Sequence, residues 1–558
     1  MSDTGAGKIP LVIGVTGHRD ILAQDLPAYE EAIKAFFSAL QTSYPNTPIT
    51  LISSLAEGAD RLVAKMALEC GHEVIAPLPF PAEEYERDFP ESVAEFRELL
   101  QKVPASNVLT LPLVEGNTSL SIRQDSASRD RQYAGVAAYL ASKSHVVLAL
   151  WDGKYGAKTG GTSEVVKFML NGVPPAYDAD TSLLDPIDTG PVYHVLTRRA
   201  RDEEAVSKPG GARWIYPEDS GEPACETIFR HIETFNADKA RRHQAAVKRA
   251  RAYLLPETKA LGSAATRILD IYGYADSMAI RYQRFARRML IFILVLAGAM
   301  ALAFEIYAHL VVERYVLALY PMFFLAITAA YFWHRSVGAH GKYLDYRALA
   351  EGLRVQLFWR LAGLNDSVTG SYLRKQSDEL EWIRSALRTT ALIPADRRNS
   401  DLGLVYERWI KDQEDYFVRC AHRQHRRVEQ FERLANWLYG TGLVVSIFTI
   451  GLWDRIEHAH GLHHVLIVVM GFAPVMAALW ISYADKTGLQ AQSKQYKRFA
   501  VIFARARRIF DTLRAEAQIS VGGDAVEELL RELGKEALIE NGDWVLLHRE
   551  RPIDIPKG

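Results

Sequence analysis

Four apolar segments in the second half of the chain constrain its fold more than any other feature. They span residues 289–311, 316–333, 437–453 and 465–481. A helix needs about 20 apolar residues to cross a bilayer, and roughly 17 to 25 are tolerated. Each segment is therefore long enough for one crossing, although four buried helices of a soluble bundle are the alternative.

Basic residues favour the membrane interpretation, because they lie outside each pair of segments rather than between its members. The flanking basic residues are Arg281, Arg284, Arg287, Arg288, Arg335, Lys342, Arg419, Arg423, Arg426, Arg427, Arg433, Lys486, Lys494, Lys497 and Arg498. The connection inside each pair holds a single arginine, Arg314 or Arg455. The positive-inside rule then predicts two membrane hairpins, with the N-terminal half, the middle segment and the C-terminal tail in the cytoplasm.

The two hairpins resemble copies of one unit. The sequence YQRFARR (282–288) before the first parallels VEQFERL (428–434) before the second, and YRALA (346–350) parallels YKRFA (496–500). The spacing is about 150 residues in both comparisons. A repeat in the same orientation is a parallel tandem, which disfavours an alternating-access permease.

The first apolar segment contains two polar residues, Glu305 and His309. Ionisable residues inside a membrane helix mark functional sites by default. Alternatively, these polar residues indicate that the helix ends early, before the end of the apolar segment. We favour this second interpretation.

The first 225 residues have a different pattern, in which short β-rich runs alternate with helical periodicity. We expect strands at 10–15, 48–53, 73–78, 145–150 and 192–196, and helices at 28–40, 60–68 and 163–170. This alternation predicts a Rossmann-like α/β domain with a doubly wound, mostly parallel sheet. Residues 171–191 and 208–222, rich in turn-forming residues, are interpreted as loops. The expected segments are 1–225 (ligand-binding domain), 226–288 (helical coupling), 289–333 (hairpin 1), 334–436 (cytosolic helices), 437–482 (hairpin 2) and 483–558 (C-terminal helices and tail).

Three loops that follow expected strands carry the candidate ligand-binding residues. They are Gly14, Thr16, Gly17, His18 and Arg19 in the first loop, Ser53, Ser54, Glu57, Gly58 and Asp60 in the second, and Asp152, Gly160, Gly161, Thr162 and Glu164 in the third. Loops at the carboxyl ends of parallel strands share one crevice, where backbone N–H groups can hold an anion. Glycines also serve turns for conformational reasons alone. We expect Asp60 to cap a helix rather than to catalyse.

A cluster of arginines could add phosphate contacts to this crevice. Arg131 is the candidate, with Arg123 and Arg129 nearby, although the same residues could simply solvate a helix. The formal net charge of -1 and the pI near 7.0 argue against nucleic-acid binding. Cys70, Cys225 and Cys420 are far apart, so neither a disulfide framework nor a zinc site is indicated, and no metal or cofactor is expected.

The sequences GVTGHR (14–19), SSLAEGAD (53–60) and GGTSE (160–164) resemble those of SLOG domains. This Rossmann-like superfamily includes the LOG enzymes, DprA-type proteins and the N-terminal region of TRPM channels. The second half is similar to SLATT membrane modules, through its paired helices, YRALAEGLR (346–354), ENGDW (540–544) and RERP (549–552). The resemblance implies a sensor of a nucleotide or NAD-derived messenger, such as a cyclic nucleotide or an ADP-ribose derivative, coupled to a bacterial inner-membrane effector in antiviral defence. Few polar residues line the apolar segments, so we expect a homo-oligomer.

The LOG branch of this superfamily suggests an enzyme as the alternative. In that branch, a Pro-Gly-Gly-x-Gly-Thr-x-x-Glu loop supplies a glutamate that cleaves an N-glycosidic bond. Residues 159–164, TGGTSE, lack the proline and one glycine, and Glu164 is one residue closer to the threonine. One residue turns a helical side chain by about 100°. Glu164 is therefore either the catalytic residue of a nucleotide or riboside hydrolase, with Arg19 or Arg131 on phosphate, or a first-turn carboxylate favoured by the helix dipole.

Overall fold

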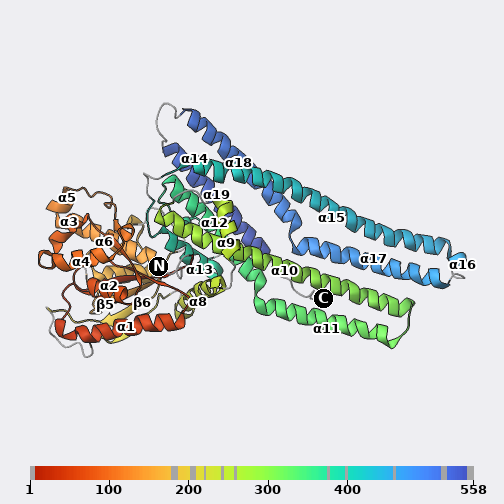
Figure 1. Cartoon of the computed structure of the whole chain (residues 1–558), viewed down its shortest axis with the longest axis horizontal. Coiled ribbons are helices and arrows are strands. Elements are labelled where there is room, and N and C mark those ends of the chain that lie inside the picture. Colours follow the sequence, from red (N-terminus) through yellow and green to blue (C-terminus); the bar gives the residue numbers. More distant parts are fainter. Residues whose placement is uncertain are drawn as a thin grey trace. The chain divides into compact units, whose positions relative to one another are not determined.

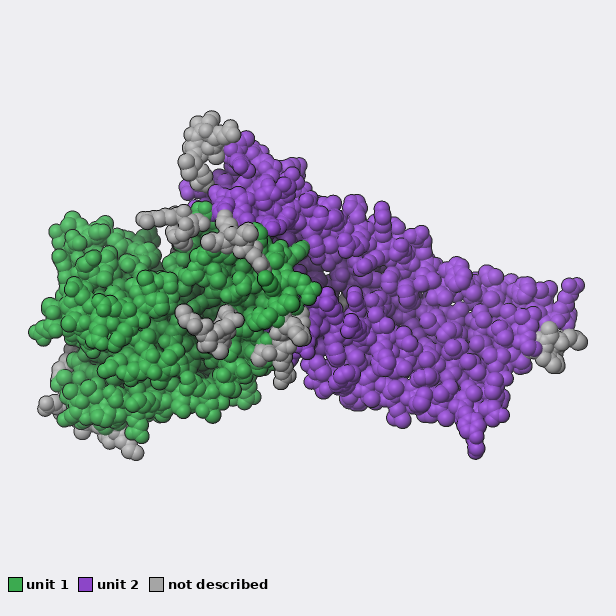
Figure 2. Space-filling model, in the orientation of Figure 1, with its two compact units in different colours: residues 1–274, 352–400 green, residues 275–351, 401–558 purple. Residues whose placement is uncertain are grey.

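The computed structural model describes residues 7–156, 158–177, 187–200, 209–218, 221–240, 244–256, 261–373, 377–395, 400–456, 460–516 and 524–549. Parts of the expected loops 171–191 and 208–222, and all but the first residue of RERP (549–552), lie outside this range. The chain divides into two compact units, residues 1–274 with 352–400 and residues 275–351 with 401–558 (Figure 2).

The first unit contains a seven-stranded sheet in the order β4-β3-β2-β1-β5-β6-β7 (Figure 1). The strands are β1 (Leu11–Gly17), β2 (Ile49–Ile52), β3 (Glu73–Leu78), β4 (Val108–Thr110), β5 (Val146–Trp151), β6 (Val192–Leu196) and β7 (Ala212–Ile215). All neighbouring pairs are parallel except β6 and β7. The predicted doubly wound, mostly parallel sheet is thereby confirmed. The expectation of a loop throughout 208–222 was wrong, because β7 forms a short antiparallel edge there that the surrounding glycines and prolines conceal.

Helices cover both faces of this sheet. The apolar residues of α1 (Leu26–Ser43), α2 (Ala59–Glu69) and α4 (Val93–Lys102) pack in one core cluster, and those of α6 (Ser126–Lys143) and α7 (Thr162–Asn171) pack in the other. In α1 the buried residues follow the helical spacing of the sequence, from Tyr29 through Ile33 to Leu40. The chain winds from β1 toward β4 on one side and from β5 toward β6 on the other. The winding therefore reverses between β1 and β5, which is where such sheets bind ligands.

The first unit extends beyond the sheet and its covering helices. It includes α8 (Gly221–Ala240), α9 (Gln244–Leu254) and α13 (Ser377–Arg388), and the expected boundary near Cys225 falls inside α8. The Asn236 amide exchanges two hydrogen bonds with the backbone of Ile9, at 3.0 and 2.9 Å. The His145 ring, at the start of β5, bonds the carbonyl of Ser385 at 3.0 Å. Segments distant in sequence thus complete one core.

The second unit is helical in the part of it that the structure describes. Apolar stretches long enough to cross a membrane occur in four helices, α10 (Ser263–His309), α11 (Arg314–Val337), α15 (Asp412–Gly451) and α17 (His460–Lys486). The remaining long helices are α12 (Ala339–Ala362), α18 (Leu489–Glu516) and α19 (Asp524–Arg549). α11 ends at Gly338 with φ +61°, and Gly488, between α17 and α18, has φ +63°. These left-handed glycines are 150 residues apart, as the tandem repeat predicts.

The first membrane helix differs from our expectation at its outer end. α10 continues without a break through Glu305 to His309, so the expectation of an earlier end was wrong. A glutamate has good intrinsic helix propensity, and hydrophobicity alone does not locate a helix end. α10 begins in the first unit and continues into the second.

Candidate functional site

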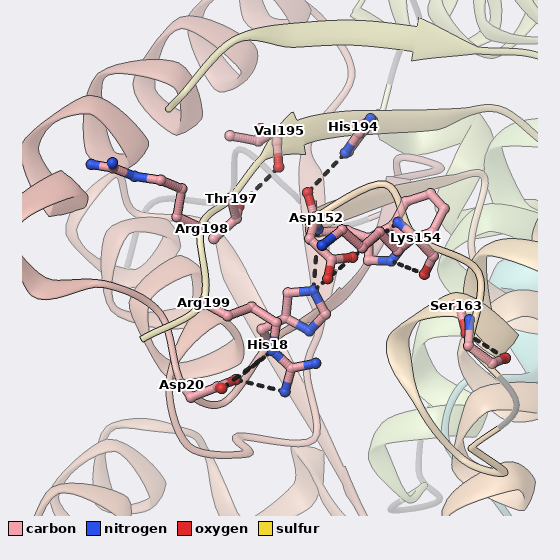
Figure 3. A network of polar contacts seen from close by, with 12 residues as sticks. His18, Asp20, Asp152, Lys154, Ser163, His194, Val195, Thr197, Arg198 and Arg199 are labelled. Carbon is pink, nitrogen blue, oxygen red and sulfur yellow. Dashed lines mark hydrogen bonds and ion pairs between the residues drawn. The ribbon is translucent and has the colours of Figure 1, made fainter. Parts of the chain in front are cut away.

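Two side chains meet at the point where the winding of the sheet reverses. His18 follows β1 and Asp152 follows β5, and Nε2 of His18 lies 3.1 Å from the amide nitrogen and 3.2 Å from Oδ1 of Asp152 (Figure 3). Burial lowers the pKa of His18, and the Arg199 cation lowers it further, although Asp152 raises it. The ring is therefore neutral at neutral pH, and Nε2 accepts the amide hydrogen of Asp152.

The second loop packs against the first through a glycine. Gly58 has φ +84°, and a Cβ atom there would lie 2.3 Å from the carbonyl oxygen of Arg19. The amide of Ala59 donates to the carbonyl of His18 at 3.1 Å. Only glycine permits both this conformation and this approach, so Gly58 fixes the two loops against each other.

Asp60 is the most perturbed acid of the second loop. Its side chain is 5% exposed, and Oδ2 accepts a hydrogen bond from Oγ of Ser54 at 2.8 Å. Burial raises the pKa of Asp60 to about 7, against the lowering effects of Ser54 and the Arg19 cation. The expected role as a cap was wrong, because Gly58 is the N-cap of α2 and the Asp60 carboxyl turns back toward the loop. A buried carboxyl that is half protonated at neutral pH is typical of functional sites.

The third loop ends at α7, where Glu164 makes a local contact. Its carboxylate accepts a hydrogen bond from the amide of Gly160, just before the helix. Gly160 has φ +72°, and a Cβ atom there would lie 2.4 Å from Cβ of Tyr133. The N-cap Gly161 has no side chain to bond the first-turn N–H groups, starting at Thr162, which remain suited to an anion. This geometry agrees with Glu164 as a first-turn carboxylate.

Other candidate residues have packing or local polar contacts. A Cβ atom at Gly14, in the middle of β1, would lie 2.3 Å from Oγ of Ser144, and one at Gly17 would lie 2.3 Å from Cβ of Ala59. Both glycines are thus explained by close packing. Thr16 is buried beside them.

The remaining polar candidates bond to neighbouring elements. Oγ of Ser53 accepts from the amide of Leu55 at 3.2 Å, and Glu57 accepts from Oγ of Ser92 at 2.6 Å. Arg131 donates to Asn117 at 3.1 Å and to Ser128 at 2.8 Å.

Arg123 and Arg129 make ion pairs in this structure. Both pair with the buried Glu84, at 2.9 and 3.1 Å. This pairing is neither the phosphate contact nor the solvated helix that their sequence suggested.

Two features of the crevice were missed from the sequence. Arg199, directly after β6, pairs with Asp20 of the first loop at 2.8 Å (Figure 3). The guanidinium of Arg19 lies 5.4 Å from the ring centroid of Tyr133 in α6, and the Tyr133 hydroxyl bonds Asp88. Two consecutive arginines at the end of a strand were a signal for the first feature. The contact between Arg19 and Tyr133 had no signal in the sequence, because it depends on tertiary packing.

The buried hydroxyl of Tyr85 (Ala82–Tyr85 form α3) is also close to these groups. It has no hydrogen-bond partner within the described ranges. Its electrostatic neighbours include Ser54, Tyr133, Arg19 and Asp60. A buried polar atom without a partner is unusual in a folded protein.

A cavity lies at the opposite ends of the strands, away from His18 and Asp152. A pocket of about 820 Å³ opens at the amino ends of β1, β2 and β3, between Tyr44, His72 and Arg267. Open α/β sheets bind ligands at the carboxyl ends of their strands, so we assign the candidate site to the His18–Asp152 crevice.

No group of three His, Cys, Asp or Glu residues that could hold a metal ion occurs among the residues that the structure describes. The chain has no match among protein-family models, curated proteins or solved structures.

Proposed function

We propose that the chain is a ligand-gated membrane effector. Its SLOG-like domain binds a nucleotide or NAD-derived messenger, such as a cyclic nucleotide or an ADP-ribose derivative. The bound state is passed to a homo-oligomeric membrane region of SLATT type, which opens or disrupts the bilayer. The protein acts at the inner membrane of a bacterium in antiviral defence, with its sheet domain, middle segment and C-terminal tail in the cytoplasm.

One observation carries the ligand class: three glycine-containing loops meet where the sheet reverses its winding. Half-protonated Asp60 carries less negative charge than an ordinary carboxylate, and the Arg19 cation lies beside it. The Arg199 cation is offset by its ion pair with Asp20, so Arg19 is the positive charge on which this argument depends. First-turn N–H groups of α7 add partial positive charge. An anion such as a phosphate is the chemistry that this combination favours.

Helix α10 supports the coupling part of the proposal. Arg267, in its first turns, pairs with Glu73 of β3. The same helix continues to His309, through most of the first apolar segment. A ligand shifts a conformational equilibrium only if its affinity differs between the two states. Because α10 belongs to both the sheet unit and the membrane unit, a change of conformation on ligand binding can pass along one continuous helix.

The test is calorimetric titration of the full-length protein in lipid nanodiscs with cyclic nucleotides and ADP-ribose derivatives, with the same mixtures assayed for breakdown. We expect binding without turnover, and loss of binding in Arg19→Ala. Arg97→Ala removes an exposed arginine that pairs with Glu86 and should leave affinity unchanged. The bound ligand should then release dye from liposomes that contain the protein.

Three outcomes would contradict the proposal or one of its parts. Turnover that disappears in Glu164→Gln would make the domain a membrane-anchored hydrolase of LOG type. A monomeric mass in detergent would contradict the homo-oligomer. Binding that is equal in Arg19→Ala and the wild type would place the ligand elsewhere, with the pocket near Tyr44 and His72 as the next candidate.

A further inference from the structure

Glu305 is the only Asp, Glu, Lys or Arg in the four apolar segments. α10 continues through it, so the residue is part of a membrane-spanning helix and not of a loop. Charged side chains at such positions are costly, and they persist where they face a partner or an ion pathway. The continuous helix favours a functional role for Glu305 over an early helix end.

Glu305 lies against the other hairpin, at a glycine of α17. A Cβ atom at Gly471 would lie 2.5 Å from Oε1 and 3.0 Å from Oε2 of Glu305. Two turns earlier on α10, a Cβ atom at Gly298 would lie 3.3 Å from Sδ of Met476. The two helices thus form an antiparallel seam (Figure 1). The missing side chain of Gly471 leaves the space that the carboxyl occupies.

The second polar residue of the segment is the neighbour of this carboxyl. Nε2 of His309, one turn farther along α10, lies 3.6 Å from Oε2 of Glu305. At about 1.5 Å per residue, Glu305 is roughly 25 Å along the helix from Arg288, the last basic residue before the segment. The pair therefore lies toward the far end of the span. Residues 465–481 of α17 contain no titratable side chain.

The α17 backbone also carries a freed carbonyl oxygen. Pro474 lies inside α17 and has no N–H, so the carbonyl of Met470 lacks its usual helical donor. This oxygen faces α15, where a Cβ atom at Gly442 would lie 3.7 Å from it, so the side chains of Glu305 and His309 carry the site. Asp, Glu and His side chains inside membrane helices mark ion pathways and proton relays.

We propose that Glu305 and His309 form a binding site for a small monovalent cation, a proton or a sodium ion, in the seam between the two hairpins. The bound cation neutralises the carboxylate and so permits the close packing of α10 against α17. Loss of the cation leaves an ionised group in an apolar seam, which favours separation of the hairpins. This site does not depend on the nucleotide ligand, and its test needs none.

The test is labelling of the full-length protein in liposomes with dicyclohexylcarbodiimide, followed by mass spectrometry. This reagent adds to a protonated carboxyl in apolar surroundings, and the carboxyl proton moves to a carbodiimide nitrogen. We expect Glu305 to be labelled, and its labelling rate to fall about tenfold per pH unit above the midpoint, because only the protonated form reacts. Replacing choline chloride by sodium chloride distinguishes the occupants: slower labelling identifies sodium, and an unchanged rate identifies the proton.

Matched variants separate the site from general accessibility. Glu305→Gln should lose the label, whereas Glu313→Gln, just outside the segment, should leave it unchanged. Gly471→Ala places a methyl group in the carboxyl position and should change the rate or its pH midpoint, whereas Gly461→Ala on the same helix has open space and should not. Labelling of wild-type Glu305 that is no faster than that of Glu313, or that ignores both pH and sodium, would overturn the proposal.

Discussion

Asp60→Asn should stabilise the sheet unit at alkaline pH, although it removes a polar residue from the candidate site. Burial raises the pKa of Asp60 from 3.8 to about 7. The folded state therefore holds the proton more tightly than the unfolded chain does. Stability is unaffected below about pH 4, falls as the pH rises from about 4 to about 7, and stays reduced above that.

The magnitude follows from this shift. One pKa unit is 1.36 kcal/mol, so ionised Asp60 reduces the free energy of unfolding by about 4 kcal/mol above pH 7, of which about 3 kcal/mol develops between pH 5 and pH 8. An asparagine keeps the acceptor for Ser54 but adds an N–H₂ group whose lost hydration costs about 1–3 kcal/mol. Asp60→Asn should then differ little from the wild type at pH 5, where ionisation of Asp60 already costs the wild type about 1–2 kcal/mol, and should be more stable than the wild type at pH 8.

The assay is hydrogen–deuterium exchange of peptides that cover α2, in the full-length protein, corrected for the pH dependence of intrinsic exchange. Local opening is measured because a protein of several units does not unfold in one step. The opening constant of the wild type relative to the variant should rise on the order of a hundredfold from pH 5 to pH 8. Asp25→Asn is the control without pH dependence in this window, since the Arg198 hydrogen bond lowers the pKa of Asp25 from 3.8 and the carboxyl is ionised in both the folded and the unfolded chain from pH 5 to pH 8. The same ratio at both pH values would refute the reasoning.

Two further predictions concern packing in the same unit. Gly58→Ala should lower the free energy of unfolding by about 1–3 kcal/mol more than Gly71→Ala does. Both glycines have positive φ, but only Gly58 has backbone atoms within 3 Å of the added methyl group. Thermal unfolding of the two variants compares these losses, and equal losses would contradict the prediction. Burial lowers the pKa of His145 to about 4, and its ring accepts from the amide of Val12 at 3.0 Å, so its stabilising contribution is complete above about pH 6.5 and decreases as the pH falls toward 4. The stability difference between wild type and His145→Asn should shrink by about 2 kcal/mol from pH 7 to pH 5, measured by exchange in α13, and a constant difference would exclude this role.

The sequence by itself determined the fold class and the membrane helices. The four apolar segments need only length and composition to be recognised, and the repeat near Tyr346 and Tyr496 fixed their arrangement as two hairpins. The strands from β1 to β6, apart from the short β4, were recognisable because their apolar runs are bounded by turn residues. The apolar segments and the strands are local patterns, set by residues within about 20 positions of one another, whereas the repeat compares segments about 150 residues apart.

The tertiary structure decided the chemistry of the candidate site and of the seam. The pKa of Asp60 depends on burial by α2 and its neighbours. Burial and the Arg199 cation, 181 positions away, lower the pKa of His18 against the opposing effect of Asp152, 134 positions away. Glu305 looked like a helix end until Gly471 of another hairpin was found against it. Desolvation and charge act through space, so residues that are distant in the chain set them, and no local pattern encodes those distances.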